Sequence, residues 1–202
     1  MKKRPFALIA AMVACILMGL SGFLGGATDV AWFRGDVSDE ARVPPGTSEE
    51  DAQRLAALSA RRREIRDAGR RRLLPLAVAN LLVSALLFVA ANRALVGRPG
   101  ARTLALQAIA ANALVAVLTH ALTSDVRGQL IDALLTFQAP GALKVPSDVV
   151  DPRAFLWVVY RIQLGLGLGL YGLAWAALST QSARAYLAPA PASTDTRPER
   201  DD

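Results

Sequence analysis

The stretch Ala154–Ser179 constrains the fold more than any other part of the chain, because Arg161 is its only charged residue. An α-helix rises about 1.5 Å per residue, so about 20 apolar residues cross the roughly 30 Å hydrocarbon core of a bilayer. This stretch is long enough to do so. We therefore predict a transmembrane helix over residues 154–179 that continues to about residue 187.

Three further apolar blocks of similar length precede it. The predicted spans are residues 5–27, 73–96, 103–123 and 154–179. The chain has 202 residues, of which 53% are hydrophobic. A soluble protein would interrupt its apolar residues with polar ones at the period of a helix or a strand, whereas here they come in blocks. We predict an all-α integral membrane protein with four transmembrane helices in a bundle.

The segments outside the spans are polar and in part helical. They comprise a basic N-terminus (1–4), a loop (28–72) with a helix over about 48–72, a short turn (97–102), a loop (124–153) with an amphipathic helix over about 125–138, and a disordered tail (188–202). Thr47 and Glu50 form a capping box for the first of these helices. Pro75 falls in the first turn of the second span, and Asp151-Pro152 caps the fourth.

Seven arginines crowd the end of the first polar loop. They are Arg61, Arg62, Arg63, Arg66, Arg70, Arg71 and Arg72. We expect them to lie on a solvated helix and to meet lipid phosphates, and the alternative is a docking face for an acidic partner.

The N-terminal block also has features of a secretory signal, since a basic start precedes an apolar core. The run over residues 5–27 is longer than a usual signal core and long enough to span a bilayer. We predict an uncleaved signal-anchor, and cleavage after Ala27 stays open.

Small residues form stripes on two of the predicted spans. Gly165 and Gly169 make a GxxxG pair, and helical spacing puts Arg161, Gly172 and Ala176 on the same face. The first span carries a similar stripe made of Cys15, Gly19, Gly22 and Gly26. Such faces let another helix approach closely, so we expect each to pack against a helix of this chain or of a second copy.

Polar side chains inside the spans form a second pattern. The turn after the second span is short, so the second and third spans form a hairpin in which Ser84 and Asn112 reach similar depth and can hydrogen-bond. We predict an intramembrane polar cluster of Ser21, Asn80, Ser84, Asn112, His120, Arg161 and Gln163. The cluster either fixes helix register or forms a ligand or ion site.

Catalytic, metal and cofactor sites are not predicted. The single cysteine, Cys15, excludes an internal disulfide, and the single histidine, His120, excludes a two-histidine metal site within one chain. The spans hold no Asp or Glu, which disfavours proton-coupled transport. Gly19-Leu20-Ser21-Gly22 resembles the GxSG of rhomboid proteases. That motif lies on a late helix of a six-helix core, whereas here it is in the first of four, so we predict no membership.

Charge and composition give a location. The formal net charge is +6, and arginine far outnumbers lysine in an alanine-rich chain, which indicates a GC-rich bacterial genome. Basic residues in a membrane protein set topology, and we predict no nucleic-acid partner. The basic N-terminus and the basic turn place both termini in the cytoplasm of a bacterial inner membrane, although the arginine-rich loop opposes this orientation.

These features favour a small non-enzymatic accessory or scaffold subunit that acts through helix packing and loop docking. Its partners would be the bilayer and a larger membrane complex or further copies of itself. The alternative is an oligomeric channel or carrier component in which Asn80, Asn112 and Arg161 line a path. An unrecognised membrane enzyme is a third hypothesis.

Overall fold

Every described element of the computed structural model, which covers residues 5–36, 47–137 and 151–188, is a helix. In chain order the helices are α1 (Phe6–Arg34), α2 (Glu49–Leu95), α3 (Ala101–Leu122), α4 (Ser124–Phe137), α5 (Pro152–Ser179) and α6 (Gln181–Leu187). Four of these, α1, α2, α3 and α5, are long and apolar enough to cross a membrane. The all-helical prediction and the four candidate spans are confirmed. The predicted basic N-terminus (1–4) and nearly all of the predicted tail lie outside the described residues.

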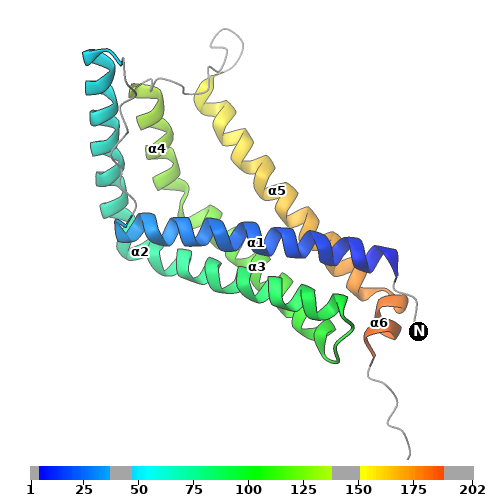
Figure 1. Ribbon diagram of the computed structural model, residues 1–202. Coiled ribbons are helices and arrows are strands. Elements are labelled where there is room, and N and C mark those ends of the chain that lie inside the picture. The colour runs from blue at the N-terminus through cyan, green and yellow to red at the C-terminus, as the bar shows by residue number, and fades with distance from the viewer. Residues whose placement is uncertain (1–4, 37–46, 138–150, 189–202) are drawn as a thin grey trace, which may run out of the picture.

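The long helices lie together, and two shorter segments stand away from them (Figure 1). Helix α1 runs along the second half of α2, which in turn packs on α3, while α5 crosses obliquely and contacts α1 and α3. The first half of α2 and α4 project from one end of this layer. The N-terminal end of α1 and α6 lie together at the opposite end.

Helix α2 corrects two predictions. We expected a helix over about 48–72 and a separate span from residue 73, but one continuous helix covers Glu49–Leu95. Pro75, expected in the first turn of a span, lies in its interior. A proline there lacks the N–H of an intrahelical bond and its ring meets the carbonyl four residues earlier, so it kinks the helix. Figure 1 shows the sharp bend that separates residues 49–72, hereafter the arm, from the rest.

The N-cap predicted for α5 is confirmed, and the one predicted for α2 is one residue off. Asp151 caps α5, and its side chain accepts the backbone N–H of Arg153 at 2.9 Å, as predicted. The cap of α2 is Ser48 instead of the expected Thr47, and its hydroxyl accepts the N–H of Asp51 at 3.1 Å. Glu49, Glu50 and Asp51 lie in the first turn. Their negative charges interact favourably with the positive end of the helix dipole, whichever residue is the cap.

Two other boundaries differ from the sequence predictions. Helix α1 continues to Arg34 instead of ending at residue 27. The predicted continuation of the fourth span to about residue 187 is a separate helix, because α5 ends at Ser179 and Thr180 caps α6. The hydroxyl of Thr180 accepts the N–H of Ala183 at 3.3 Å, which starts a new helix in a new direction.

Two groups of buried apolar residues hold the helices together. The larger joins α1, α2, α3, α5 and α6 and includes Met12, Leu87 and Leu178. The smaller joins the end of α1, the arm and α4 through Phe33, Ile65, Leu73, Val126 and Ala133. The predicted amphipathic helix is α4, and it packs against the arm through this group.

The turn after α2 closes the other end of the layer. Gly97 and Gly100 have φ of 72° and 74°, a left-handed conformation that favours glycine. The hydroxyl of Tyr186 on α6 donates to the carbonyl of Leu95 at 3.2 Å, and Arg102 Nε donates to the carbonyl of Leu178 at 3.0 Å. These bonds fix α6 and the end of α5 beside the turn.

Exposed apolar side chains are distributed unevenly. Large hydrophobic residues are exposed on α1, the second half of α2, α3 and α5, for example Leu17, Leu82 and Leu166, and a few more lie on α4. Among the described residues 47–77, by contrast, no large hydrophobic side chain is exposed. The arm therefore has the surface of a solvated helix, and the long helices do not.

Candidate functional site

The small-residue stripe of α1 is filled by α2. A Cβ atom added to Gly19 would lie 2.9 Å from the backbone N of Phe88, and one added to Gly26 would lie 3.0 Å from Leu81 Cα. A Cβ at Gly22 would overlap Ser84 Oγ, and Cys15 is buried beside them. The predicted close neighbour is therefore present, and it is α2.

The small-residue stripe of α5 is not filled. Gly165, Gly169 and Gly172 are exposed, and an added Cβ would meet no heavy atom within 4 Å at any of them. Ala176 and Arg161, on the same face, are also exposed, and Arg161 makes no hydrogen bond or ion pair with the described residues. The packing predicted for this face is not made within the described chain. We call these five residues the open face of α5.

Ser84 and Asn112 form the hydrogen bond predicted between the second and third spans. Ser84 Oγ donates to Asn112 Oδ1 at 3.3 Å, and both side chains are buried. Asn112 Nδ2 also donates to the carbonyls of Val83 and Ala108, each at 2.8 Å. The amide thus joins α3 to α2 through two hydrogen bonds and makes a third within α3.

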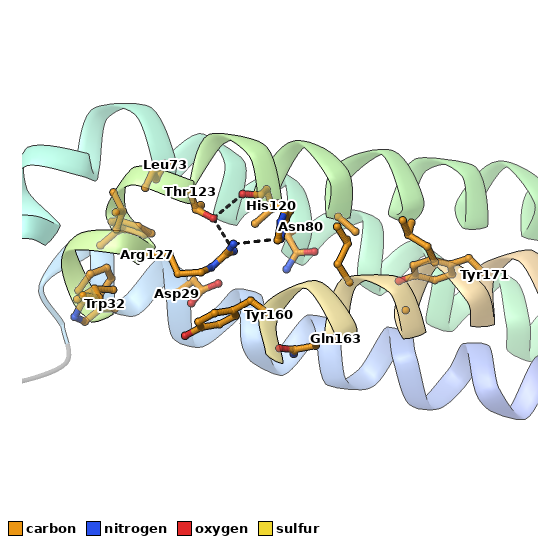
Figure 2. A pocket seen from close by; sticks show the side chains of 18 residues that line it. Asp29, Trp32, Leu73, Asn80, His120, Thr123, Arg127, Tyr160, Gln163 and Tyr171 are labelled. Atoms are coloured by element: carbon orange, nitrogen blue, oxygen red, sulfur yellow. Dashed lines mark hydrogen bonds between the residues drawn. The ribbon is translucent and has the colours of Figure 1, made fainter. Parts of the chain in front are cut away.

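A cavity of about 590 Å³ lies near the arm end of the long helices, with walls from α1 to α5 (Figure 2). Its polar lining comes from Asp29, Asn80, Thr119, His120, Thr123, Arg127, Tyr160, Gln163 and Tyr171. Its apolar lining comes from Trp32, Phe33, Leu73, Ala116, Val126, Leu130, Leu164, Gly167 and Leu168. The cavity therefore brings together polar side chains from five helices.

Arg127 is the cation of this cavity. Its Nη1 lies 3.2 Å from His120 Nδ1, its Nη2 donates to Thr123 Oγ1 at 2.9 Å, and its guanidinium carbon lies 4.6 Å from the centre of the Tyr160 ring. A guanidinium can only donate, so His120 Nδ1 is the acceptor and the neutral imidazole carries its proton on Nε2. Thr123 in turn donates to the carbonyl of Thr119 at 2.6 Å, which fixes its lone pairs toward Arg127.

None of these partners of Arg127 is a carboxylate. Partial burial lowers the pKa of Arg127, because desolvation disfavours its charged form. Arg72 shows the contrast, since its Nη2 lies 2.7 Å from both carboxylate oxygens of exposed Asp125, and this bond lowers the pKa of Asp125. Arg127 carries its charge among neutral groups.

Two further polar groups of the cavity lack partners within the described residues. The hydroxyl oxygen of Thr119 is buried and makes no hydrogen bond there. Asp29, on α1, forms no hydrogen bond or ion pair with residues 5–36, 47–137 or 151–188, and it does not lie within ion-pair distance of Arg127. The cavity thus combines a guanidinium, a carboxylate and a hydroxyl that are all able to bind something else.

The predicted polar cluster divides into separate groups. Asn80, His120 and Gln163 line the cavity, and Ser84 and Asn112 bond to each other elsewhere. Ser21 and Arg161 are exposed and do not line the cavity, so Ser21 and His120 are not assembled as a nucleophile and base. For the same reason Asn80, Asn112 and Arg161 do not share this cavity as the wall of one path.

Sequence reasoning missed Asp29, Arg127 and Tyr160 as members of the site. The spacing of His120, Thr123 and Arg127 by three and four residues was the available signal, since it predicts one helical face. We had instead separated Arg127 from His120 by a span boundary. No three His, Cys, Asp or Glu side chains of the described residues gather into a possible metal site.

Comparison with known proteins gives no relative: the sequence matches no protein family, no curated protein and no solved structure. The features that bear on function are therefore structural: the cavity, the arm and the open face of α5.

Proposed function

We propose that this is a multi-pass membrane protein whose four spans form a bundle, and that it acts without catalysis as an accessory or scaffold subunit. The apolar side chains exposed on α1, α2, α3 and α5 support insertion, since a soluble monomer rarely exposes so much contiguous apolar surface. The absence of exposed large hydrophobic residues from residues 47–77 supports an arm in water.

The observation that carries the assembly role is the open face of α5. Gly165, Gly169 and Gly172 form a shallow groove with no atoms opposite them in the described chain. Arg161 lies about 10 Å inside the predicted span, where a charged group without partners is costly in hydrocarbon. A second helix seated on this face would fill the groove and offer polar partners to Arg161. The occupant is a span of a larger membrane subunit or of another copy of this chain.

The arm supports docking outside the bilayer. Arg62, Arg63, Arg70 and Arg71 are exposed and pair with no carboxylate of the described residues. Their charges can meet lipid phosphates or an acidic partner surface, as the sequence suggested. The arm lies on the side of the long loops, which we assign to the exterior of the bacterial cytoplasmic membrane, with both termini in the cytoplasm.

The test is affinity purification of the full chain from its native membrane in mild detergent, followed by mass measurement of the intact assembly. We expect a stoichiometric membrane partner or a defined homo-oligomer. Gly169→Leu should remove that species, because leucine fills the groove. Gly25→Leu is the matched control, since Gly25 is also exposed with no heavy atom within 4 Å of an added Cβ.

Retention of the assembly by Gly169→Leu, or a wild-type protein that is monomeric and alone, would contradict the proposal. A homo-oligomer would bring the channel or carrier hypothesis forward, because copies of Arg161 would then face each other. Ion flux into liposomes, compared between wild type and Arg161→Leu, would test it.

A further inference from the structure

We propose that the cavity binds one phospholipid whose headgroup carries both a phosphate and an ammonium, with Arg127 at the phosphate and Asp29 at the ammonium. This inference goes beyond the assembly role and concerns a different surface of α5. It shares with the proposed function only the insertion of the long helices into a bilayer.

The anion side of the site is built around Arg127. Two of its five N–H donors are used on His120 and Thr123, which orient the guanidinium without neutralising it. The remaining donors are available to the cavity, and charge-assisted bonds to phosphate are the strongest that an arginine makes. The hydroxyl of Thr119, one turn before Thr123, has no hydrogen-bond partner among the described residues and supplies a further donor.

The cation side of the site is built around Asp29. Asp29, Trp32 and Tyr160 all line the cavity, and in the view of Figure 2 Asp29 lies below Arg127. A cavity lined by a carboxylate and two aromatic rings suits an ammonium group, which interacts with both kinds of side chain. A pure anion would be repelled by Asp29 and a pure cation by Arg127, so a zwitterion is the ligand that satisfies both charges.

The rest of the cavity favours an amphiphile over a small soluble zwitterion. Tyr160, Gln163, Leu164, Gly167, Leu168 and Tyr171 line it from one face of α5. From Tyr160 to Tyr171 this face runs about 16 Å along the helix. The polar groups gather toward Tyr160, while Leu164, Gly167 and Leu168 follow further along the span. An added Cβ at Gly167 would meet no heavy atom within 4 Å, which leaves the groove open for an acyl chain.

The depth of the polar end of the cavity relative to the predicted spans agrees with a bound phospholipid. Asp29 lies just after the predicted first span and Arg127 just after the third, whereas Leu168 lies well inside the fourth. Headgroups lie at the boundary of the hydrocarbon core and acyl chains lie within it. A phospholipid seated with its headgroup at Arg127 therefore keeps both of its parts in their ordinary environments.

The experiment is native mass spectrometry of the full chain after delipidation in mild detergent. Phosphatidylethanolamine, phosphatidylglycerol and soluble glycerophosphoethanolamine are added in separate titrations. We expect one tightly bound phosphatidylethanolamine per chain, weaker phosphatidylglycerol binding and no binding of the soluble headgroup. Equal binding of both lipids would overturn the zwitterion assignment, and tight binding of the soluble headgroup would overturn the lipid assignment. Unsaturable binding of many lipids would overturn the site.

Variants test each part of the site. Arg127→Gln should weaken phosphatidylethanolamine binding about tenfold or more, because it removes a charge-assisted contact. Arg98→Gln, in the turn at the opposite end, should leave it unchanged. Asp29→Asn should abolish the preference for phosphatidylethanolamine over phosphatidylglycerol. Wild-type behaviour of Arg127→Gln would contradict the proposal.

A second pair of variants guards against misfolding of Arg127→Gln and separates the two proposals. Gly167→Leu adds a side chain where no described heavy atom lies within 4 Å, so the protein should still fold. The leucine should block the groove and weaken lipid binding, while the native assembly is kept. Gly165→Leu, on the open face, should impair assembly while lipid binding is kept. Lipid binding unaffected by Gly167→Leu would overturn the acyl-chain groove, whatever the outcome for assembly.

Discussion

Helices α1 and α5 both carry a stripe of small residues, but only the stripe of α1 is packed against another helix. The stripe of Gly19, Gly22 and Gly26 on α1 is pressed against the backbone of α2, so closely that no Cβ would fit at any of the three. The stripe of Gly165, Gly169 and Gly172 on α5 has no described atom within 4 Å of an added Cβ. A small-residue stripe therefore marks a face that can be approached closely, and it does not say what approaches it.

The difference has a physical origin in the chain's connectivity. Helix α2 follows α1 and runs back along it, so the stripe of α1 is closed within the chain. Helix α5 comes last of the long helices and crosses the layer obliquely (Figure 1). Its residues Tyr160, Leu164 and Tyr171 line the cavity. Its glycines lie on a different side of the helix and are left for lipid or for a partner.

The largest effect should come from the closed stripe. Gly19→Leu forces a side chain into the space held by the backbone of Phe88 and Ser84, which cannot yield as a flexible side chain would. Overpacking of this kind costs about 3 kcal/mol. Reversible unfolding in mixed detergent should show the loss, and Gly25→Leu should lie within about 0.5 kcal/mol of wild type. Equal stability of the two variants would contradict the close contact of α1 with α2.

A smaller effect should come from the buried polar contact between α2 and α3. Asn112→Ala removes the bonds to Ser84 and to the carbonyl of Val83. Such interhelical bonds contribute about 1 kcal/mol. The same unfolding assay measures it, with Asn92→Ala as control, because the amide of Asn92 donates within its own helix to the carbonyl of Phe88. If both variants lose the same stability, the interhelical bond contributes nothing of its own.

A still smaller effect is expected where the arm meets α4. Asp125→Asn breaks the ion pair with Arg72, and an exposed, solvent-screened pair contributes about 0.5 kcal/mol. Arg72 lowers the pKa of Asp125, so its stabilisation is present at neutral pH and is lost as pH falls through the lowered, folded-state pKa. The difference between wild type and variant should therefore vanish in acid, and also in high salt. A difference that persists at low pH would show that the charge is not its source.

The smallest effect on stability should come from the open face. Gly169→Leu places a leucine in empty space, and leucine is a better helix former than glycine, so the monomer in detergent should lose no stability. The comparison with Gly19→Leu in one unfolding assay is the sharpest test of the closed and open faces. A loss of similar size for both variants would mean that α5 packs differently from its arrangement here.

The site was predicted only in part, because the sequence gives the depth of a residue along its helix but not the direction in which that residue faces. Residue spacing gives the depth of each polar residue: it places Asn80 and Arg161 at comparable depth, His120 nearer the surface, and Gln163 about 3 Å deeper than Arg161. It does not give the rotation of α5, which turns Gln163 toward the cavity and Arg161 away from it. Asp29 was missed because it was assigned to a loop, whereas α1 continues through it. Arg127 was expected on a helix outside the spans, and only the placement of α4 brings it to His120.

The sequence by itself determined the elements that depend on local composition. Blocks of apolar residues long enough to span a bilayer fixed the four long helices, and Asp151-Pro152 fixed the start of α5, because length and caps act within one segment. Only the tertiary structure decided that the arm and the second span are one helix bent in its interior, which stripe is closed, and which polar residues share a cavity. These outcomes depend on the rotation and crossing of helices far apart in the chain, and no local pattern encodes them.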